Sequence, residues 1–192
     1  MVEKSEMIRN QFARMVGASP AEIGFISSTS EGENIIVNAL DFQSGDNVVV
    51  DDLHYSTSFV IYKHLEETKG VELRIVQNRE GRVTPEDFAT HVNRRTRLIS
   101  VAWVSHQNGF RHDMKALSEL AHAHDAYLYT DAVQAIGMFP MNLRETGIDF
   151  LASGTYKWLF ACFGVAPFYV RKELLERIPP DRRGHYHIAK VL

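Results

Sequence analysis

Short apolar runs alternate with amphipathic segments along nearly the whole chain, and this alternation is the strongest restriction on its fold. The apolar runs predict strands at residues 23–26, 47–50, 71–76, 98–104, 126–130, 150–152 and 164–170. The segments between them predict helices at 3–16, from a cap at 27–30 to 40, at 57–68, from 84 onward, at 113–124 and at 171–178. Strands separated by helices of about ten residues favour a mostly parallel sheet with helices on both faces, a three-layer α/β/α fold.

The length of the chain suits one domain. A chain of 192 residues buries about two thirds of its unfolded surface. No repeat or low-complexity linker divides it, so we expect a single domain over residues 1–192, with an N-terminal helix at 1–16 and a tail from about 180 to 192. Five apolar residues lie on one side of that helix: Met7, Ile8, Phe12, Met15 and Val16.

Composition excludes several classes of function. The net charge of −3 leaves no basic footprint for nucleic acid. No run approaches the roughly 20 apolar residues that span a bilayer. The N-terminus is polar and of mixed charge, unlike a signal peptide, and the single Cys162 cannot form an internal disulfide. We therefore expect a cytoplasmic protein without nucleic-acid or membrane partners.

Nine histidines raise the question of a metal site. His122 and His124 are two apart on a predicted helix, so they point to different faces. His185 and His187 share a face only if their segment is extended. Since no pair has zinc-protease or zinc-finger spacing, we expect no metal.

Polar residues that suit a ligand site follow several of the predicted strands. The serine-rich turn 27–30 follows one strand, and Tyr55, His106 and Asp131 come after three others. In parallel α/β sheets, ligands bind at the carboxyl ends of the strands. We therefore expect these residues to converge on one site.

The segment Ser28 to Gly32 lies where a strand hands over to a helix. Free backbone N–H groups and the positive end of the helix dipole favour a phosphate there, and the hydroxyls of Thr29 and Ser30 add donors. The alternative is an ordinary serine/threonine helix cap without a ligand.

Asp131 ends an apolar strand, and Gln134 follows three residues later. A buried carboxylate needs a cationic partner, which a protonated pyridine nitrogen supplies. The alternatives for Asp131 are a helix cap or a lysine pair. Gln134 is placed to donate to a phenolic oxygen on such a ring, or it is an exposed helix residue.

Tyr55 and His106 are aromatic candidates from two other loops. The Tyr55 ring is placed to stack on a pyridine face, with core packing as the alternative. His106 is placed to contact the ring oxygen or to relay protons near neutral pH. The alternative for His106 is a loop histidine without a catalytic role.

Lys157 lies between Tyr156 and Trp158 in an otherwise apolar stretch. Lysine is rare in such surroundings unless it is paired or covalently modified, and burial favours the neutral amine, which is the nucleophile. A lysine and an acid presented in this way are what pyridoxal phosphate (PLP) requires, the amine for a Schiff base and the carboxylate for the pyridine nitrogen. The freed amine is also placed to move a substrate α-proton. The alternative is a lysine that snorkels out of an aromatic patch.

Three segments resemble the class V aminotransferase family of PLP-dependent fold type I enzymes, which includes cysteine desulfurases and isopenicillin N epimerase-like proteins. They are residues 25–31, 131–137 and 149–158. The resemblance implies the fold type I large domain, PLP as cofactor, an amino acid substrate and a homodimer. By that resemblance Lys157 forms the Schiff base, Asp131 pairs with the pyridine nitrogen and Gln134 lies near the ring oxygen. It also assigns phosphate contacts to Thr29, Ser30 and Ser153, and the ring-stacking position to Tyr55.

Three positions depart from the desulfurase pattern. Tyr55 and Tyr156 stand where desulfurases often have histidine, and His106 stands where many members have asparagine. Members of the family are also roughly twice as long, with a small C-terminal domain that carries a substrate-binding arginine and, in desulfurases, a catalytic cysteine. Neither has a match here, so we expect the large domain alone, and we expect Cys162 to be structural.

The sequence therefore predicts a PLP-dependent enzyme that acts on an amino acid by transamination, elimination, desulfuration or epimerisation. The alternative is a catalytically inactive PLP domain that serves as a binding or assembly module. A nicotinamide dehydrogenase is a weaker candidate, because the chain has no Gly-x-Gly-x-x-Gly fingerprint.

Overall fold

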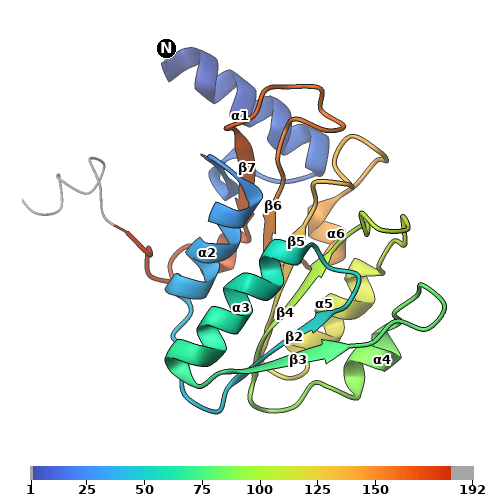
Figure 1. Cartoon of the computed structure of the whole chain (residues 1–192). Coiled ribbons are helices and arrows are strands. Elements are labelled where there is room, and N and C mark those ends of the chain that lie inside the picture. The colour runs from blue at the N-terminus through green and yellow to red at the C-terminus, as the bar shows by residue number, and fades with distance from the viewer. Residues whose placement is uncertain (1, 183–192) are drawn as a thin grey trace, which may run out of the picture.

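A computed structural model describes residues 2–182, and one seven-stranded sheet runs through its centre (Figure 1). Its strands are β1 (Ile23–Ile26), β2 (Asn47–Asp51), β3 (Glu72–Val76), β4 (Thr96–Ala102), β5 (Tyr127–Asp131), β6 (Phe150–Ala152) and β7 (Ala166–Val170). Their spatial order is β1-β7-β6-β5-β4-β2-β3. The five strands β2 to β6 are parallel to one another, and β7 is antiparallel to both of its neighbours, β1 and β6. The predicted sheet is confirmed.

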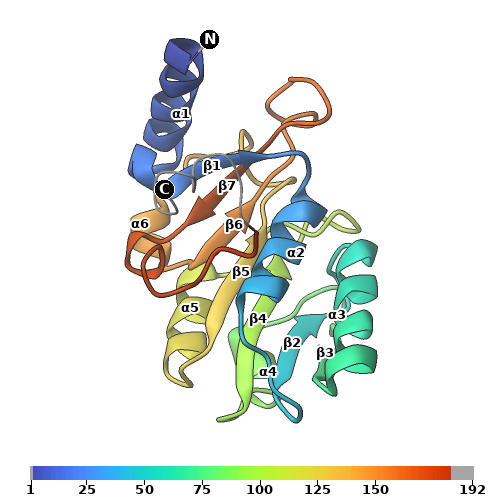
Figure 2. The same cartoon turned by 90° about the vertical axis from the view of Figure 1, so that its left-hand side faces the viewer.

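Helices cover both faces of this sheet. They are α1 (Val2–Val16), α2 (Thr29–Ala39), α3 (Ser56–Lys69), α4 (Pro85–Ala89), α5 (Met114–His122) and α6 (Leu143–Thr146), with short 3₁₀ turns at η1 (Pro20–Glu22) and η2 (Lys172–Leu174). Figure 2 shows α2 and α3 on one side and α5 on the other. Two separate hydrophobic clusters fill the two interfaces, one with α2 and α3 and one with α1, α4, α5 and α6. This is the expected three-layer α/β/α fold.

The central strands are apolar on both faces because both faces are covered. In β2, Val48 and Val50 belong to the cluster under α2 and α3, while Val49 between them belongs to the opposite cluster. All three side chains are fully buried. Residues 2–182 contain no helix that is both long and apolar enough to cross a membrane.

The N-terminal helix buries less of its apolar side than its sequence indicates. Phe12 and Val16 pack into the core, but Met7, Ile8 and Met15 are exposed. Only the C-terminal half of α1 reaches the sheet (Figure 1). The first half therefore presents its apolar residues to solvent.

The predicted helix at 171–178 is wrong, because the structure has only the 3₁₀ turn η2 there. The backbone N–H of Arg171 donates to the carbonyl of Asp149, and that of Lys172 to a carboxylate oxygen of Glu22. These tertiary contacts fix the start of the segment, while Pro179 and Pro180 prevent helix from continuing beyond it. The end of the predicted tail, residues 183–192, lies outside the described residues.

The direction of the strands brings their carboxyl ends to one edge. β2, β4, β5 and β6 are parallel, and β1 shares their direction because it is antiparallel to β7, which is antiparallel to β6. Segments that are more than a hundred residues apart in the sequence therefore meet at this edge.

Candidate active site

A hollow opens at the carboxyl edge of the sheet, and eight of the nine predicted site residues line it. Those eight are Thr29, Ser30, Tyr55, His106, Asp131, Gln134, Tyr156 and Lys157. They come from four loops, from the last residue of β5 and from the N-terminus of α2, so the convergence expected from the strand ends is present. The other lining residues are Ser28, Glu33, Thr57, Ser58, Ala102, Val104 and Val133.

The N-terminus of α2 forms one wall of the hollow. Ser28 caps the helix, and its hydroxyl accepts a hydrogen bond from the N–H of Glu31 (3.1 Å). The N–H groups of Thr29 and Ser30 belong to the first turn, where no helical carbonyl precedes them to act as acceptor. Together with the helix dipole they make a favourable position for a phosphate.

α2 lies unusually close to the sheet at this point because residue 32 is glycine. A Cβ on Gly32 would lie 2.7 Å from the Cβ of Ala152 and 2.9 Å from Cδ1 of Ile26. The close approach lets the N–H of Gly154 donate to the hydroxyl of Thr29 (3.0 Å). The turn before α2 and the loop after β6 are thereby joined.

Asp131 is the last residue of β5 and faces the hollow. One carboxylate oxygen accepts the N–H of Val133 (2.8 Å). Desolvation raises the pKa of Asp131 to about 6, against the lowering effects of that N–H and of the charge on Lys157. Burial makes the charged form of Asp131 less favourable. A cationic ligand group beside it would stabilise that form, so Asp131 suits such a group.

Lys157 lies in the loop after β6 and is partly exposed within the hollow, not buried as its apolar neighbours indicate. The adjacent residue holds this loop in place, because the indole N–H of Trp158 donates to Oε1 of Gln134 (2.9 Å). The carbonyl of Trp158 also approaches Gly137, which has φ of +91° and where a Cβ would lie 2.7 Å from that oxygen. A side chain at position 137 would push the loop away.

The contact with Trp158 also orients the amide of Gln134. An indole nitrogen only donates, so the amide oxygen of Gln134 must face it. The NH₂ group of Gln134 is then available as a donor on the hollow side. The role of Gln134 beside a ring oxygen stays a prediction.

Aromatic residues form the mouth of the hollow. The ring of Tyr55 meets the ring of His106 edge to face, with centroids 5.1 Å apart. Tyr156 stacks on Phe163 at 4.2 Å, and partial desolvation together with the charge of Asp131 raises the pKa of Tyr156. Phe160 and Phe163, from the same loop as Tyr156, are strongly exposed.

Two residues of this region are placed differently from the others. Ser153 is buried and does not line the hollow, although its neighbour Gly154 is bonded to Thr29. Its phosphate contact stays a prediction. Cys162, expected to be structural, is exposed in the loop, where its carbonyl rather than its thiol accepts a bond, from Thr155.

The sequence reasoning missed a group of buried polar residues in the wall of the hollow and beneath it. Glu33, His54, Ser58 and Ser100 come from α2, the loop before α3, α3 and β4. One signal for Glu33 was available: it lies three and four residues before Ile36 and Val37 and therefore shares their buried helix face. No such signal marks His54, whose partner in the sheet is distant in sequence.

This three-layer fold, with its hollow at the carboxyl edge of the sheet, is the fold of the large domain of PLP-dependent fold type I enzymes. The chain belongs to the class V aminotransferase family, since the family model "Aminotransferase class-V" matches residues 1–191. Among residues 2–182, no three potential metal ligands are grouped together.

Over the aligned residues, individual relatives are between 27% and 32% identical to this chain. The "uncharacterized aminotransferase YcbU" of Bacillus subtilis is 32% identical over 180 residues, which are 93% of this chain and 48% of the relative. A cysteine desulfurase of Escherichia coli K12 is 29% identical, over 98% of this chain and 48% of its own length. The structure of a cysteine desulfurase from Thermococcus onnurineus superimposes with a TM-score of 0.87 at 27% identity, over 95% of this chain and 46% of that one. This chain thus spans about half the length of the relatives it matches.

Proposed function

We propose that this chain binds PLP in the hollow and acts on an amino acid through it. The observation that carries the proposal is that Lys157 and Asp131 line one hollow whose wall is the N-terminus of α2. When bound, PLP supplies an aldehyde that joins to an amine and a pyridine ring that accepts electrons. The proposed reaction is transamination or a related elimination, desulfuration or epimerisation.

Each wall of the hollow suits one part of the cofactor. The carboxylate of Asp131 pairs with the protonated ring nitrogen, and the NH₂ of Gln134 with His106 takes the ring oxygen. The first-turn N–H groups and hydroxyls of Thr29 and Ser30 bind the phosphate, with Ser153 and Tyr156 next to them. The ring of Tyr55 stacks on the pyridine face.

Lys157 has two tasks in this proposal. Its Nζ holds the cofactor covalently in the resting protein, and the same amine accepts and returns the substrate α-proton during turnover. The loop keeps Lys157 in position through the bond between Trp158 and Gln134. Lys157 and Asp131 line the same hollow, and the charge of Lys157 acts to lower the pKa of Asp131.

A PLP titration of the purified chain tests the proposal. Wild type should develop the visible absorbance of a protein-bound PLP imine and should release product from one or more amino acids. Lys157→Ala should lose both. Lys115→Ala, which removes an exposed lysine on α5, is the matched control and should behave as wild type.

The outcomes separate the candidate functions. Uptake of PLP without turnover of any amino acid would favour the binding or assembly module over the enzyme. Equal spectra for wild type, Lys157→Ala and Lys115→Ala would contradict the proposed site altogether.

We also propose that the chain forms a homodimer. The exposed apolar residues Trp158, Phe160 and Phe163 beside the hollow, and Met7 and Ile8 on α1, support association. Sedimentation of the purified chain measures this directly. A cytoplasmic location stays a prediction, supported by the single cysteine.

A further inference from the structure

The hollow has a second carboxylate, Glu33, whose buried neighbours donate hydrogen bonds to it. Glu33 lies on α2 with 3% of its surface exposed. The hydroxyl of Ser58 on α3 donates to its Oε2 (2.8 Å), and the hydroxyl of Ser100 on β4 donates to its Oε1 (3.2 Å). One buried carboxylate therefore ties two helices to the centre of the sheet.

Two further hydrogen bonds connect Ser100 through His54 to the backbone of Tyr55. The backbone N–H of Tyr55 donates to Nδ1 of His54 (2.8 Å), so this nitrogen is an acceptor and carries no proton. Nε2 of His54 lies 2.9 Å from the hydroxyl oxygen of Ser100. Burial lowers the pKa of His54 to about 4, so the ring is neutral and its one proton is on Nε2.

These two facts, together with the ionised form of Glu33, give the direction of every bond in this relay. Tyr55 donates to His54, His54 donates to Ser100, and Ser100 donates to Glu33. The relay ends on Glu33, which accepts from two hydroxyls. Burial raises the pKa of Glu33 to about 7, so at pH 8 and above it is ionised and can only accept. Each member is buried except Tyr55, whose ring extends to the mouth of the hollow.

We propose that Glu33 is a positioning residue for Tyr55: through Ser100 and His54 it fixes the backbone of Tyr55 and so holds the tyrosine ring over the cofactor. The first part of this proposal, that Glu33 fixes the backbone of Tyr55, holds for the protein without ligand. The second part, that the ring is held over PLP, rests on the proposed function. Replacing the carboxylate with the amide of glutamine removes the charge and one of the two acceptor oxygens, so the hydroxyl of Ser58 or of Ser100 meets an NH₂ donor and the order of donors is lost.

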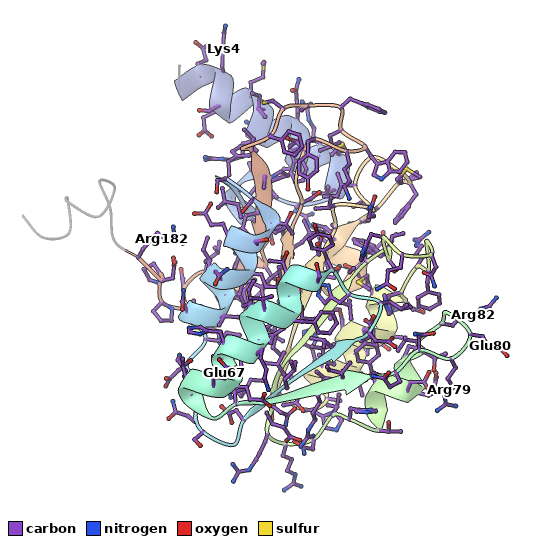
Figure 3. The ribbon with its side chains drawn as sticks, viewed as in Figure 1. Lys4, Glu67, Arg79, Glu80, Arg82 and Arg182 are labelled. Atoms are coloured by element: carbon purple, nitrogen blue, oxygen red, sulfur yellow. The ribbon has the colours of Figure 1, made fainter. Side chains whose placement is uncertain are left out.

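The first test uses the protein without cofactor. Nitrogen NMR should find His54 protonated on Nε2 alone near neutral pH. At pH 8, where Glu33 is largely ionised, hydrogen exchange at the amide of Tyr55 should be about tenfold faster or more in Glu33→Gln, because the charged acceptor at the end of the relay is lost. Ser100→Ala, which leaves Glu33 its bond from Ser58, is the milder second variant and should change exchange in the same direction. Glu67→Gln, an exposed glutamate on α3 (Figure 3), is the matched control and should leave it unchanged.

The second test uses the PLP-loaded protein. Glu33→Gln should weaken the circular dichroism of the bound cofactor, and adding Glu33→Gln to Tyr55→Leu should cause no further loss, since both act through one ring. Unchanged exchange in both Glu33→Gln and Ser100→Ala, or a proton on Nδ1 of His54, would overturn the positioning role, and additive effects would overturn its action on the cofactor. If the exchange results hold while wild type takes up no PLP, the positioning of Tyr55 is supported and the proposed function falls.

Discussion

Replacing Asp131 with asparagine should make the cofactor-free protein more stable at pH 8, although it removes a group proposed to bind the cofactor. Burial raises the pKa of this carboxyl from its ordinary value of 3.8 to about 6. The folded protein therefore ionises Asp131 less readily than the unfolded chain does. Asparagine keeps an oxygen for the N–H of Val133 and carries no charge that must be desolvated.

The size of the effect follows from the shift. At about 1.36 kcal/mol per pKa unit, the rise costs about 3 kcal/mol at any pH well above 6. This is an upper limit, because water reaches the carboxylate through the hollow. The cost is absent below pH 3.8, where Asp131 is protonated in both states, grows as the pH rises toward 6, and is constant above that. At pH 5 it should be about half its value at pH 8.

Thermal unfolding of the two cofactor-free proteins at pH 8 and at pH 5 measures this difference. The melting temperature of Asp131→Asn should exceed that of wild type by several degrees at pH 8 and by clearly less at pH 5. In the presence of PLP the order should reverse, since only wild type gains the ion pair. A variant less stable than wild type at pH 8, or a gap that is the same at both pH values, would refute the reasoning.

Two further substitutions test how the walls of the hollow are held. Gly32→Ala should destabilise the fold by about 1–2 kcal/mol in urea unfolding, because the new Cβ meets Ala152 and Ile26 and this overpacking outweighs the better helix propensity of alanine. The control Asn38→Ala, at an exposed position of the same helix, should be neutral or slightly stabilising. Equal stability of the two variants would contradict the close approach of α2 to the sheet. Trp158→Phe should weaken PLP binding about 2- to 10-fold, the value of one partly exposed hydrogen bond, as measured by absorbance titration. Unchanged affinity would show that the bond to Gln134 does not orient the site.

Much of the fold follows from local patterns in the sequence. The alternating strands and helices, and the caps at Ser28 and Thr84, depend on neighbouring residues and are present in the structure. The order of the strands and the antiparallel β7 depend on contacts between distant segments, which no local pattern records. The segment 171–178 has a helical pattern, but its bonds to Asp149 and Glu22 decide its shape.

In the candidate site, too, some residues were predictable from local sequence patterns and others depend on contacts between distant segments. Residues at strand ends, such as Asp131 and Tyr55, were predictable because parallel strands bring their carboxyl ends together. The relay under the hollow was not, since His54 and Ser100 are 46 residues apart and Glu33 and Ser100 are 67 apart. Such pairs become visible only when the sheet is assembled.

The most direct test of the account is the position at which PLP joins the chain. The wild-type protein is incubated with PLP, reduced with borohydride to fix the link, digested, and analysed by peptide mass spectrometry. The account predicts that the added mass lies on the peptide that contains Lys157, at one cofactor per chain. A label spread over exposed lysines such as Lys115, or its absence from Lys157, would contradict it.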